Sequence, residues 1–154
     1  MDDANQLIGT GLAVTLHELV YCIDTFAERL LRDGYGVGYS QYHFLAVAST
    51  LDSPDVTTLA ECLMVSKAAV SKRLDPLAAD GWITLGTDPT HARRVIIQLT
   101  PKAQQLVVDA TATLEREFAE PLGELPPGQV EQLNAHLREL LDIFIRKQET
   151  PPGA

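Results

Sequence analysis

Apolar residues recur at helical spacing along most of this chain, but one segment departs from that spacing. This departure limits the folds that the chain can adopt. Residues 82–85 and 95–99 are apolar and largely β-branched, which is typical of strands. Residues 86–94 between them are rich in turn formers, so a β-hairpin is predicted here. The other apolar-rich stretches have helical spacing. The chain is therefore predicted to be mainly α with one small β-hairpin.

Two helices are predicted at the start of the chain. Apolar residues at helical spacing indicate a helix over residues 16–31, and the three glycines within residues 34–38 are expected to end it. Ser40 is a good N-cap, so a second helix is expected to begin there and to stop before Asp52. The first helix carries a broad apolar stripe that another surface must cover.

The next segment has the pattern of a helix-turn-helix. Residues 56–63 indicate a short helix with Thr57 as its expected cap, and Ser66 is expected to cap another helix through Leu77. Pro76 lies inside this second helix, where the missing N–H should bend or shorten its end. Two short helices joined by a tight turn are the arrangement of a helix-turn-helix.

Two longer helices are predicted after the hairpin. Thr100 and Pro101 form a helix start, a hydroxyl cap followed by proline at the first helical position. A long helix then continues to Phe118, and residues 121–128 separate it from a last amphipathic helix over residues 130–144. This order of elements predicts an α/β winged helix-turn-helix flanked by helices.

The predicted fold has two parts within a single chain of 154 residues. Residues 40–100 are expected to form the winged helix-turn-helix lobe. Residues 7–32 and 102–148 are expected to form dimerisation helices, because their apolar stripes must be buried against each other, against a second chain, or both.

Charge is unevenly distributed along the chain. The formal net charge of −9 by itself disfavours an anionic partner. Residues 1–55 and 101–154 carry balances of −6 and −4, whereas residues 56–100 carry +1. The bases of this central segment form two short clusters, Lys67, Lys72 and Arg73 in one and Arg93 and Arg94 in the other. Such asymmetry favours an anionic partner at one face only.

Several motifs occur together in the centre of the chain. They are Leu-Ala-Glu-Cys-Leu-Met-Val-Ser-Lys-Ala-Ala-Val-Ser-Lys-Arg-Leu at residues 59–74, Asp-Gly-Trp-Ile at 80–83, Asp88-Pro, Arg93-Arg94 and Leu-Thr-Pro at 99–101. In combination they resemble the MarR family of transcriptional regulators, most densely over residues 56–105. The resemblance implies a homodimer that binds double-stranded DNA through both winged lobes, and that is often released by a small-molecule effector.

The second helix of a helix-turn-helix enters the major groove with its N-terminal residues at the base edges. Val70, Leu74 and Leu77 mark the buried stripe of this helix. Lysines on the opposite face can bind guanine acceptors or phosphates, and the free amides at the cap can bind a phosphate. The predicted DNA contacts here are Ser66, Lys67, Ala68, Ser71, Lys72 and Arg73.

The wing is predicted to bring Arg93 and Arg94 to the minor groove, where an arginine gains from the concentrated negative potential. The MarR family usually has an Asp-Arg-Arg string in place of His91, Ala92 and Arg93. This chain lacks the aspartate that would orient the last arginine, and Arg94 is the candidate to compensate. His91 is expected to be a solvated loop histidine.

An effector pocket would lie where the flanking helices meet the winged lobe. Five residues could supply polar groups among apolar walls there: His17, Tyr21, Tyr42, His43 and Phe44. Each of them is equally compatible with a packed or interfacial side chain.

Other classes of function find little support in the sequence. There is no Gly-rich phosphate loop, nucleophile elbow or paired-histidine motif, so neither catalysis nor a bound metal or cofactor is expected. No apolar run is long enough to cross a membrane, and the acidic start favours a cytoplasmic chain. Cys22 and Cys62 are expected to be buried and unreactive. The alternative function is a winged-helix module that binds protein, which the net charge and the altered wing favour.

Overall fold

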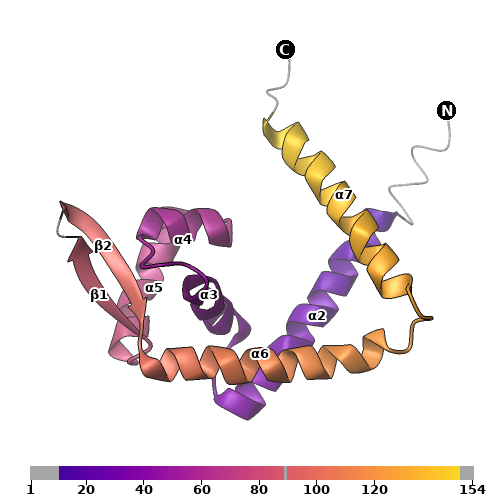
Figure 1. The fold of residues 1–154 in the computed structure, drawn as a ribbon, viewed down its shortest axis with the longest axis horizontal. Helices are drawn as coiled ribbons and strands as arrows, with labels where there is room; N and C mark the ends of the chain where they lie inside the picture. Colours follow the sequence, from indigo (N-terminus) through magenta and orange to yellow (C-terminus); the bar gives the residue numbers. More distant parts are fainter. Residues whose placement is uncertain (1–10, 89, 150–154) are drawn as a thin grey trace. The chain divides into compact units, whose positions relative to one another are not determined.

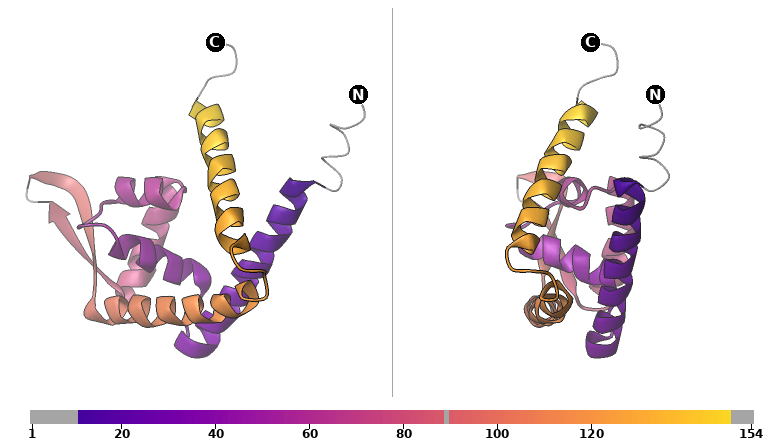
Figure 2. Two further views of the ribbon diagram at one scale, coloured as in Figure 1. Left: turned by 45° about the vertical axis from the view of Figure 1, so that its right-hand side comes forward. Right: turned by 90° about the vertical axis from the view of Figure 1, so that its right-hand side faces the viewer.

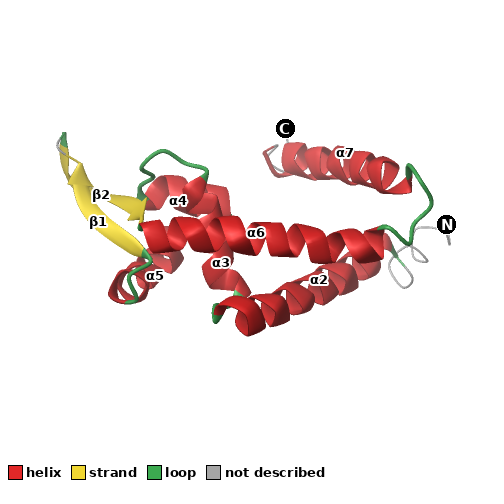
Figure 3. Cartoon of the chain, turned by 60° about the horizontal axis from the view of Figure 1, so that its bottom comes forward, coloured by secondary structure: helices red, strands yellow, loops and turns green. Residues whose placement is uncertain are grey.

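The computed structural model describes residues 11–88 and 90–149 (Figure 1). It contains helices α2 (Leu12–Tyr35), α3 (Tyr39–Ser49), α4 (Val56–Leu63), α5 (Lys67–Ala79), α6 (Pro101–Leu122) and α7 (Gln129–Glu149), and strands β1 (Ile83–Asp88) and β2 (His91–Leu99). The predicted fold class, mainly helical with one small hairpin, is confirmed (Figure 3). The chain divides into two compact units, residues 1–114 and 115–154.

Helix α2 extends beyond the predicted range at both ends. Residues 7–10 of the predicted dimerisation segment lie outside the described residues, and the helix is described from Leu12. It continues through Gly34 to Tyr35, four residues beyond the predicted range of 16–31, and Gly36 then ends it, so the prediction that the glycines end this helix is confirmed. Only at Gly36 does the backbone take the left-handed conformation (φ 69°) that closes a helix.

Helix α3 begins at Tyr39, with Gly38 at its N-cap position. The prediction that Ser40 caps this helix is therefore wrong. A carboxylate oxygen of Glu28 accepts a hydrogen bond from the Tyr39 N–H, and its other oxygen binds the Arg32 guanidinium. The backbone bond from Tyr39 is the main reason that the pKa of Glu28 lies below its usual value. A Cβ at Gly38 would lie 3.1–3.3 Å from these Glu28 and Arg32 side-chain atoms, so a glycine permits the close approach of α2 to α3.

Helices α4 and α5 form the predicted helix-turn-helix, with one cap reassigned. The predicted Thr57 cap is wrong: Asp55 Oδ1 accepts hydrogen bonds from the Thr58 N–H (2.8 Å) and hydroxyl (2.9 Å). A carboxylate that reaches two donors stabilises this end of the helix better than the Thr57 hydroxyl, which lies already inside it. The Ser66 cap of α5 is confirmed, because its hydroxyl accepts from the Ala69 N–H at 3.1 Å.

The hairpin is longer than predicted. Strands β1 and β2 are antiparallel, with Ile83 opposite Leu99 and Thr87 opposite Val95. After a shift in register, Asp88 pairs with His91, so most of the predicted 86–94 connection belongs to the strands. The far end of the hairpin extends beyond α4 and α5 (Figure 2).

The base of the hairpin is tied to the helices on either side. The Trp82 N–H donates to the Leu77 carbonyl at 2.9 Å, and the Thr100 hydroxyl donates to the Gly81 carbonyl at 2.8 Å. The Lys102 ammonium donates to the Asp80 carbonyl and lies 3.8 Å from the centre of the Trp82 ring. The Asp-Gly-Trp and Leu-Thr-Pro motifs therefore join the end of α5 and the start of α6 to the wing.

The core lies in the unit of residues 1–114. Its fully buried large side chains come from α2 to α5 and from both strands: Leu31, Phe44, Leu45, Leu59, Val70, Ile83 and Ile97. Helix α6 joins this core through polar contacts as well. The Tyr35 hydroxyl donates to the Asp109 carbonyl (2.9 Å), and the Tyr42 hydroxyl lies 2.8 Å from the Thr111 hydroxyl.

Several apolar side chains on α2 and on α7 are exposed. None of the described side chains of α7 is buried, and Leu141 and Phe144 are 58% and 57% exposed. In the first half of α2, Leu12, Leu19 and Val20 are exposed as well. Among the described helices, none has the length and apolar character needed to cross a membrane.

Both cysteines are exposed, so the expectation that they are buried is wrong. Cys22 is exposed on α2. Cys62 lies on the outer side of α4, because Leu59, Ala60 and Leu63 take its core-facing side.

Candidate nucleic-acid interface

Helix α5 has one face in the core and one face in solvent. Val70, Leu74 and Leu77 are buried, as the sequence pattern predicts. The six residues predicted to contact DNA lie outside the core: Ser66, Lys67, Ala68, Ser71 and Lys72 are exposed, and Arg73 is half-buried. Ser66 keeps its hydroxyl on the Ala69 N–H, so the start of the helix is ordered by its own cap.

One groove runs between the first turns of α5 and the wing. Its volume is about 600 Å³. Lys67 and Ser71, one helical turn apart, line it from α5, and His91 and Arg94 line it from β2. Asp55 and Thr57 close the groove at the start of α4. Side chains from the helix-turn-helix and from the wing therefore meet in a single surface feature.

A second groove, also of about 600 Å³, lies along the other side of α5. Lys72 and Arg73 line it from α5, and Ser40 and Gln41 line it from the start of α3. Arg32 of α2 adds a third cation, which sequence reasoning missed because nothing local connects it to α5. Its guanidinium is already bound to Glu28.

The Arg94 guanidinium is held by two carboxylates. Its Nε donates to Asp55 Oδ2 at 2.6 Å, and its Nη1 donates to Asp88 Oδ2 at 3.3 Å. Because Asp55 also caps α4, its bond to Arg94 connects strand β2 to the start of the helix-turn-helix. The Arg94 side chain is 48% exposed. Asp55 and Asp88 therefore fix the direction of the Arg94 side chain, and its compensating role at DNA stays a prediction.

The three groups of this cluster have shifted pKa values. The pKa of Asp55 falls to about 2, first because of the Thr58 N–H bond and then because of Arg94. The hydroxyl and N–H of Thr90 lower the pKa of Asp88, and Arg94 adds to that effect. Bonding to Asp55 raises the pKa of Arg94. All three groups are therefore charged over the physiological pH range.

His91, Ala92 and Arg93 are the other wing residues that the sequence singles out. His91 is exposed and lies opposite Asp88 near the tip of the hairpin. Ala92 and Arg93 belong to β2, and their side chains lie outside the part of the chain that the structure describes. The assignment of Arg93 as a DNA contact stays a prediction.

The segment that contains these residues matches a known family. A model described as the MarR family matches residues 35–94, from the end of α2 through most of the hairpin. The resemblance to the MarR family is confirmed. Among curated proteins none matches the chain.

Solved structures show the same MarR winged-helix fold. The chain is similar to MepR of Staphylococcus aureus in its complex with DNA, with a TM-score of 0.76 and 21% identity over 85% of this chain and 96% of that one. It is also similar to the transcriptional regulator BldR of Sulfolobus solfataricus, with a TM-score of 0.75 and 22% identity over 92% of this chain and 99% of that one. The likeness to BpsR of Bordetella bronchiseptica has a TM-score of 0.73 and 18% identity over 85% of this chain and 93% of that one.

On this MarR-type fold the five residues predicted to bind an effector lie apart. His17 and Tyr21 are exposed on α2. Tyr42 and Phe44 are buried, the first bound to Thr111 and the second in the core, where it also lines the groove beside Lys72. His43 is exposed and stacks on Tyr39 with ring centres 5.7 Å apart. The structure does not bring the five together, and their effector role stays a prediction.

A metal site is not formed by the described part of this chain. Among the residues described, no three His, Cys, Asp or Glu side chains are grouped so that they could hold an ion.

Proposed function

We propose that this chain is a sequence-specific DNA-binding regulator of transcription that occupies a pseudo-palindromic operator as a homodimer. One observation carries the proposal: Lys67 and Lys72 are exposed on the solvent face of α5, and none of the described residues forms an ion pair with them. The MarR family match and the likeness to MepR bound to DNA support the same class of function.

The two grooves explain how a chain of net charge −9 can bind a polyanion. Helix α5 stands between them, so its first turns can enter the major groove while flanking bases meet phosphates. The salt dependence of DNA affinity is set by the number of phosphates that the protein contacts, so acidic residues away from the interface do not change it. Because a dimer presents two such helices, half-sites about 10 base pairs apart are expected.

The exposed stripes of α2 and α7 support the homodimer. A soluble chain rarely leaves contiguous apolar surface of this kind in water, and a second copy would cover it. We infer that operator occupancy represses transcription, because a bound dimer blocks polymerase without any further contact surface. Control by a small molecule is supported by the likeness to BpsR, whose DNA binding is regulated by 6-hydroxynicotinic acid.

The DNA-binding proposal is tested by a gel shift on the promoter DNA next to the protein's own coding region. Binding should resist excess random duplex, and its affinity should fall steeply as salt rises. Equal affinity for promoter and random DNA would contradict sequence specificity. A folded dimer that binds neither duplex at low salt would instead favour the protein-binding alternative.

The dimer is tested with Leu141→Glu, which places a charge on the exposed stripe of α7. Sedimentation velocity should show a shift toward monomer, because the carboxylate would have to be buried without a partner. Gln132→Glu adds the same charge on another side of α7, where the side chain is exposed, and should leave the dimer intact. A dimer that survives Leu141→Glu unchanged would remove α7 from the interface.

A further inference from the structure

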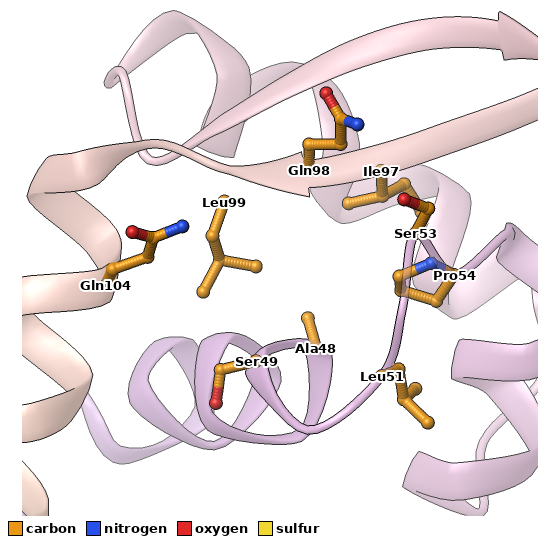
Figure 4. Close-up of a pocket in the computed structure, with 9 residues that line it drawn as sticks. All are labelled: Ala48, Ser49, Leu51, Ser53, Pro54, Ile97, Gln98, Leu99 and Gln104. Carbon is orange, nitrogen blue, oxygen red and sulfur yellow. The ribbon is translucent and has the colours of Figure 1, made fainter.

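A cavity of about 450 Å³ lies on a part of the winged lobe that the two grooves beside α5 do not reach (Figure 4). Four segments of the unit of residues 1–114 form it: the end of α3, residues 51–54, the end of β2 and the start of α6. Its volume is in the range of small-molecule sites.

The inner wall of this cavity is apolar. Ala48 of α3, Pro54 and Ile97 of β2 are buried, and Leu99 extends into the space from the same side of β2 as Ile97 (Figure 4). Gln98, between them, points to the opposite side of the strand, as the alternation of a strand requires (Figure 4). A flat apolar ligand face would therefore contact Ala48, Ile97 and Leu99.

The polar groups at this wall are uncharged. The Gln104 carboxamide is directed toward the cavity from α6, and none of the described residues hydrogen-bonds to it (Figure 4). The Ser53 hydroxyl lies at the other end, beside Pro54. All the residues that line the cavity are neutral. Asp52, whose Oδ1 accepts from the Ser53 hydroxyl at 3.3 Å, is not among the lining residues. An anion entering the cavity would therefore lose hydration without gaining a cationic partner, whereas the Gln104 carboxamide can both donate to and accept from an amide.

We propose that this cavity is a binding site for a small, flat, uncharged molecule that carries an amide or lactam group, with the Gln104 carboxamide as its polar partner. The site is distinct from the residues His17, Tyr21, Tyr42, His43 and Phe44 that the sequence suggested. It does not depend on the proposed DNA-binding function.

The cavity wall continues directly into the contacts that hold the wing. The Pro54 carbonyl accepts a hydrogen bond from the Ile97 N–H at 2.9 Å. The next residue, Asp55, caps α4 and binds Arg94. Ser53, just before, has a left-handed backbone (φ 49°), which is unusual for a serine. A ligand pressed against Pro54 therefore acts on the segment that joins α4 to β2.

The test uses three probes of nearly the same shape and different charge: benzamide, benzoate and benzamidine. Each is titrated into the full-length ¹⁵N-labelled protein, and the Gln104 side-chain amide, the Ile97 N–H and the Arg94 Nε–H are followed by NMR. Benzamide should give saturable shifts at all three groups, and it should bind at least about tenfold more tightly than either ion. No DNA is present, so a failure here is separate from a failure of DNA binding.

Two glutamines provide a matched pair of variants. Gln104→Leu removes the carboxamide that faces the cavity and should weaken benzamide binding about tenfold. Gln105→Leu removes the same group from the next position of α6, where the side chain bonds to Asp109 and does not line the cavity, and it should leave binding unchanged. Both residues are exposed, so neither change is expected to prevent folding.

Three results would overturn the assignment: no saturable shift with benzamide, equal affinity for all three probes, or equal effects of the two variants. Saturable shifts at Gln104 and Ile97 with no change at Arg94 would retain the site and overturn its coupling to the wing.

Discussion

Lys67 and Arg94 line the same groove from opposite sides, and their surroundings differ. No described residue forms an ion pair with Lys67, on α5. Arg94, on β2, is bound to two carboxylates at 2.6 and 3.3 Å. In the sequence both are bases beside a DNA-binding motif, and nothing in that pattern separates them.

The difference indicates two roles for basic residues at one interface. An unpaired lysine can exchange a counterion for a phosphate at little cost. A paired arginine must first leave its carboxylates, and those two acids would then face the DNA uncompensated. We therefore expect Lys67 to contribute directly to DNA affinity, and Arg94 to contribute by holding the wing against α4.

The largest effect is expected from removing the unpaired bases. Replacing Lys67 and Lys72 with alanine should lower operator affinity about 100-fold and reduce the salt dependence by close to one unit per lysine. Fluorescence anisotropy over a salt series measures both quantities. The control removes two exposed bases from α7 by Arg138→Ala and Lys147→Ala, which gives the same net charge. If control and test variants lose affinity equally, total charge rather than the α5 face governs binding.

A smaller effect with a different signature is expected from Arg94→Ala. Affinity should fall about tenfold because the wing loses its attachment to Asp55, while the salt dependence should stay nearly unchanged. Arg94→Lys should restore part of the affinity, since an ammonium can still bond to one carboxylate. The same anisotropy series distinguishes the roles: a drop of about one unit in the salt dependence would make Arg94 a phosphate contact instead.

The features that the sequence predicted correctly rest on local signals. The Ser66 cap, the buried stripe of Val70, Leu74 and Leu77, and the outward position of Lys67 follow from spacing along one helix. The Thr100 start of α6 is equally local, since its hydroxyl accepts from the Ala103 N–H at 3.3 Å.

The features that the sequence missed depend on residues far apart in the chain. Asp55 and Arg94 are separated by 39 positions, and only the pairing of the wing beside α4 brings them together. The Asp55 cap is an exception, because its bond to the Thr58 N–H spans only three positions and aspartate is itself a preferred N-cap residue. The cavity at Gln104 depends on four segments at once, so no local motif could have indicated it.

The bonds that Asp55 forms with Thr58 and Arg94 should also make the stability of the fold depend on pH. The pKa of Asp55 is lowered from 3.8 to about 2 by folding, so its bonds stabilise the protein fully above about pH 4. That contribution is lost as pH falls from about 4 to 2, where the carboxylate becomes protonated in both states. Between about pH 4 and 2, the free energy of unfolding measured with urea should therefore fall by about 1 kcal/mol more in the unsubstituted protein than in Asp55→Asn. Parallel pH profiles for the two proteins would contradict this role for Asp55.

The smallest effect is expected at the turn that leads into α5, where neither set of bases is touched. Met64 has a left-handed backbone (φ 54°), and its residue is 91% exposed, so its side chain contributes little packing. Met64→Gly should stabilise the fold by about 0.5–1 kcal/mol, because glycine takes this conformation without a Cβ penalty. Met64→Ala keeps the strain, so a similar gain in urea unfolding would show that the exposed side chain, not the backbone, is responsible. DNA affinity should stay the same in both variants, because the turn sets the direction of α5 without supplying charge to the groove.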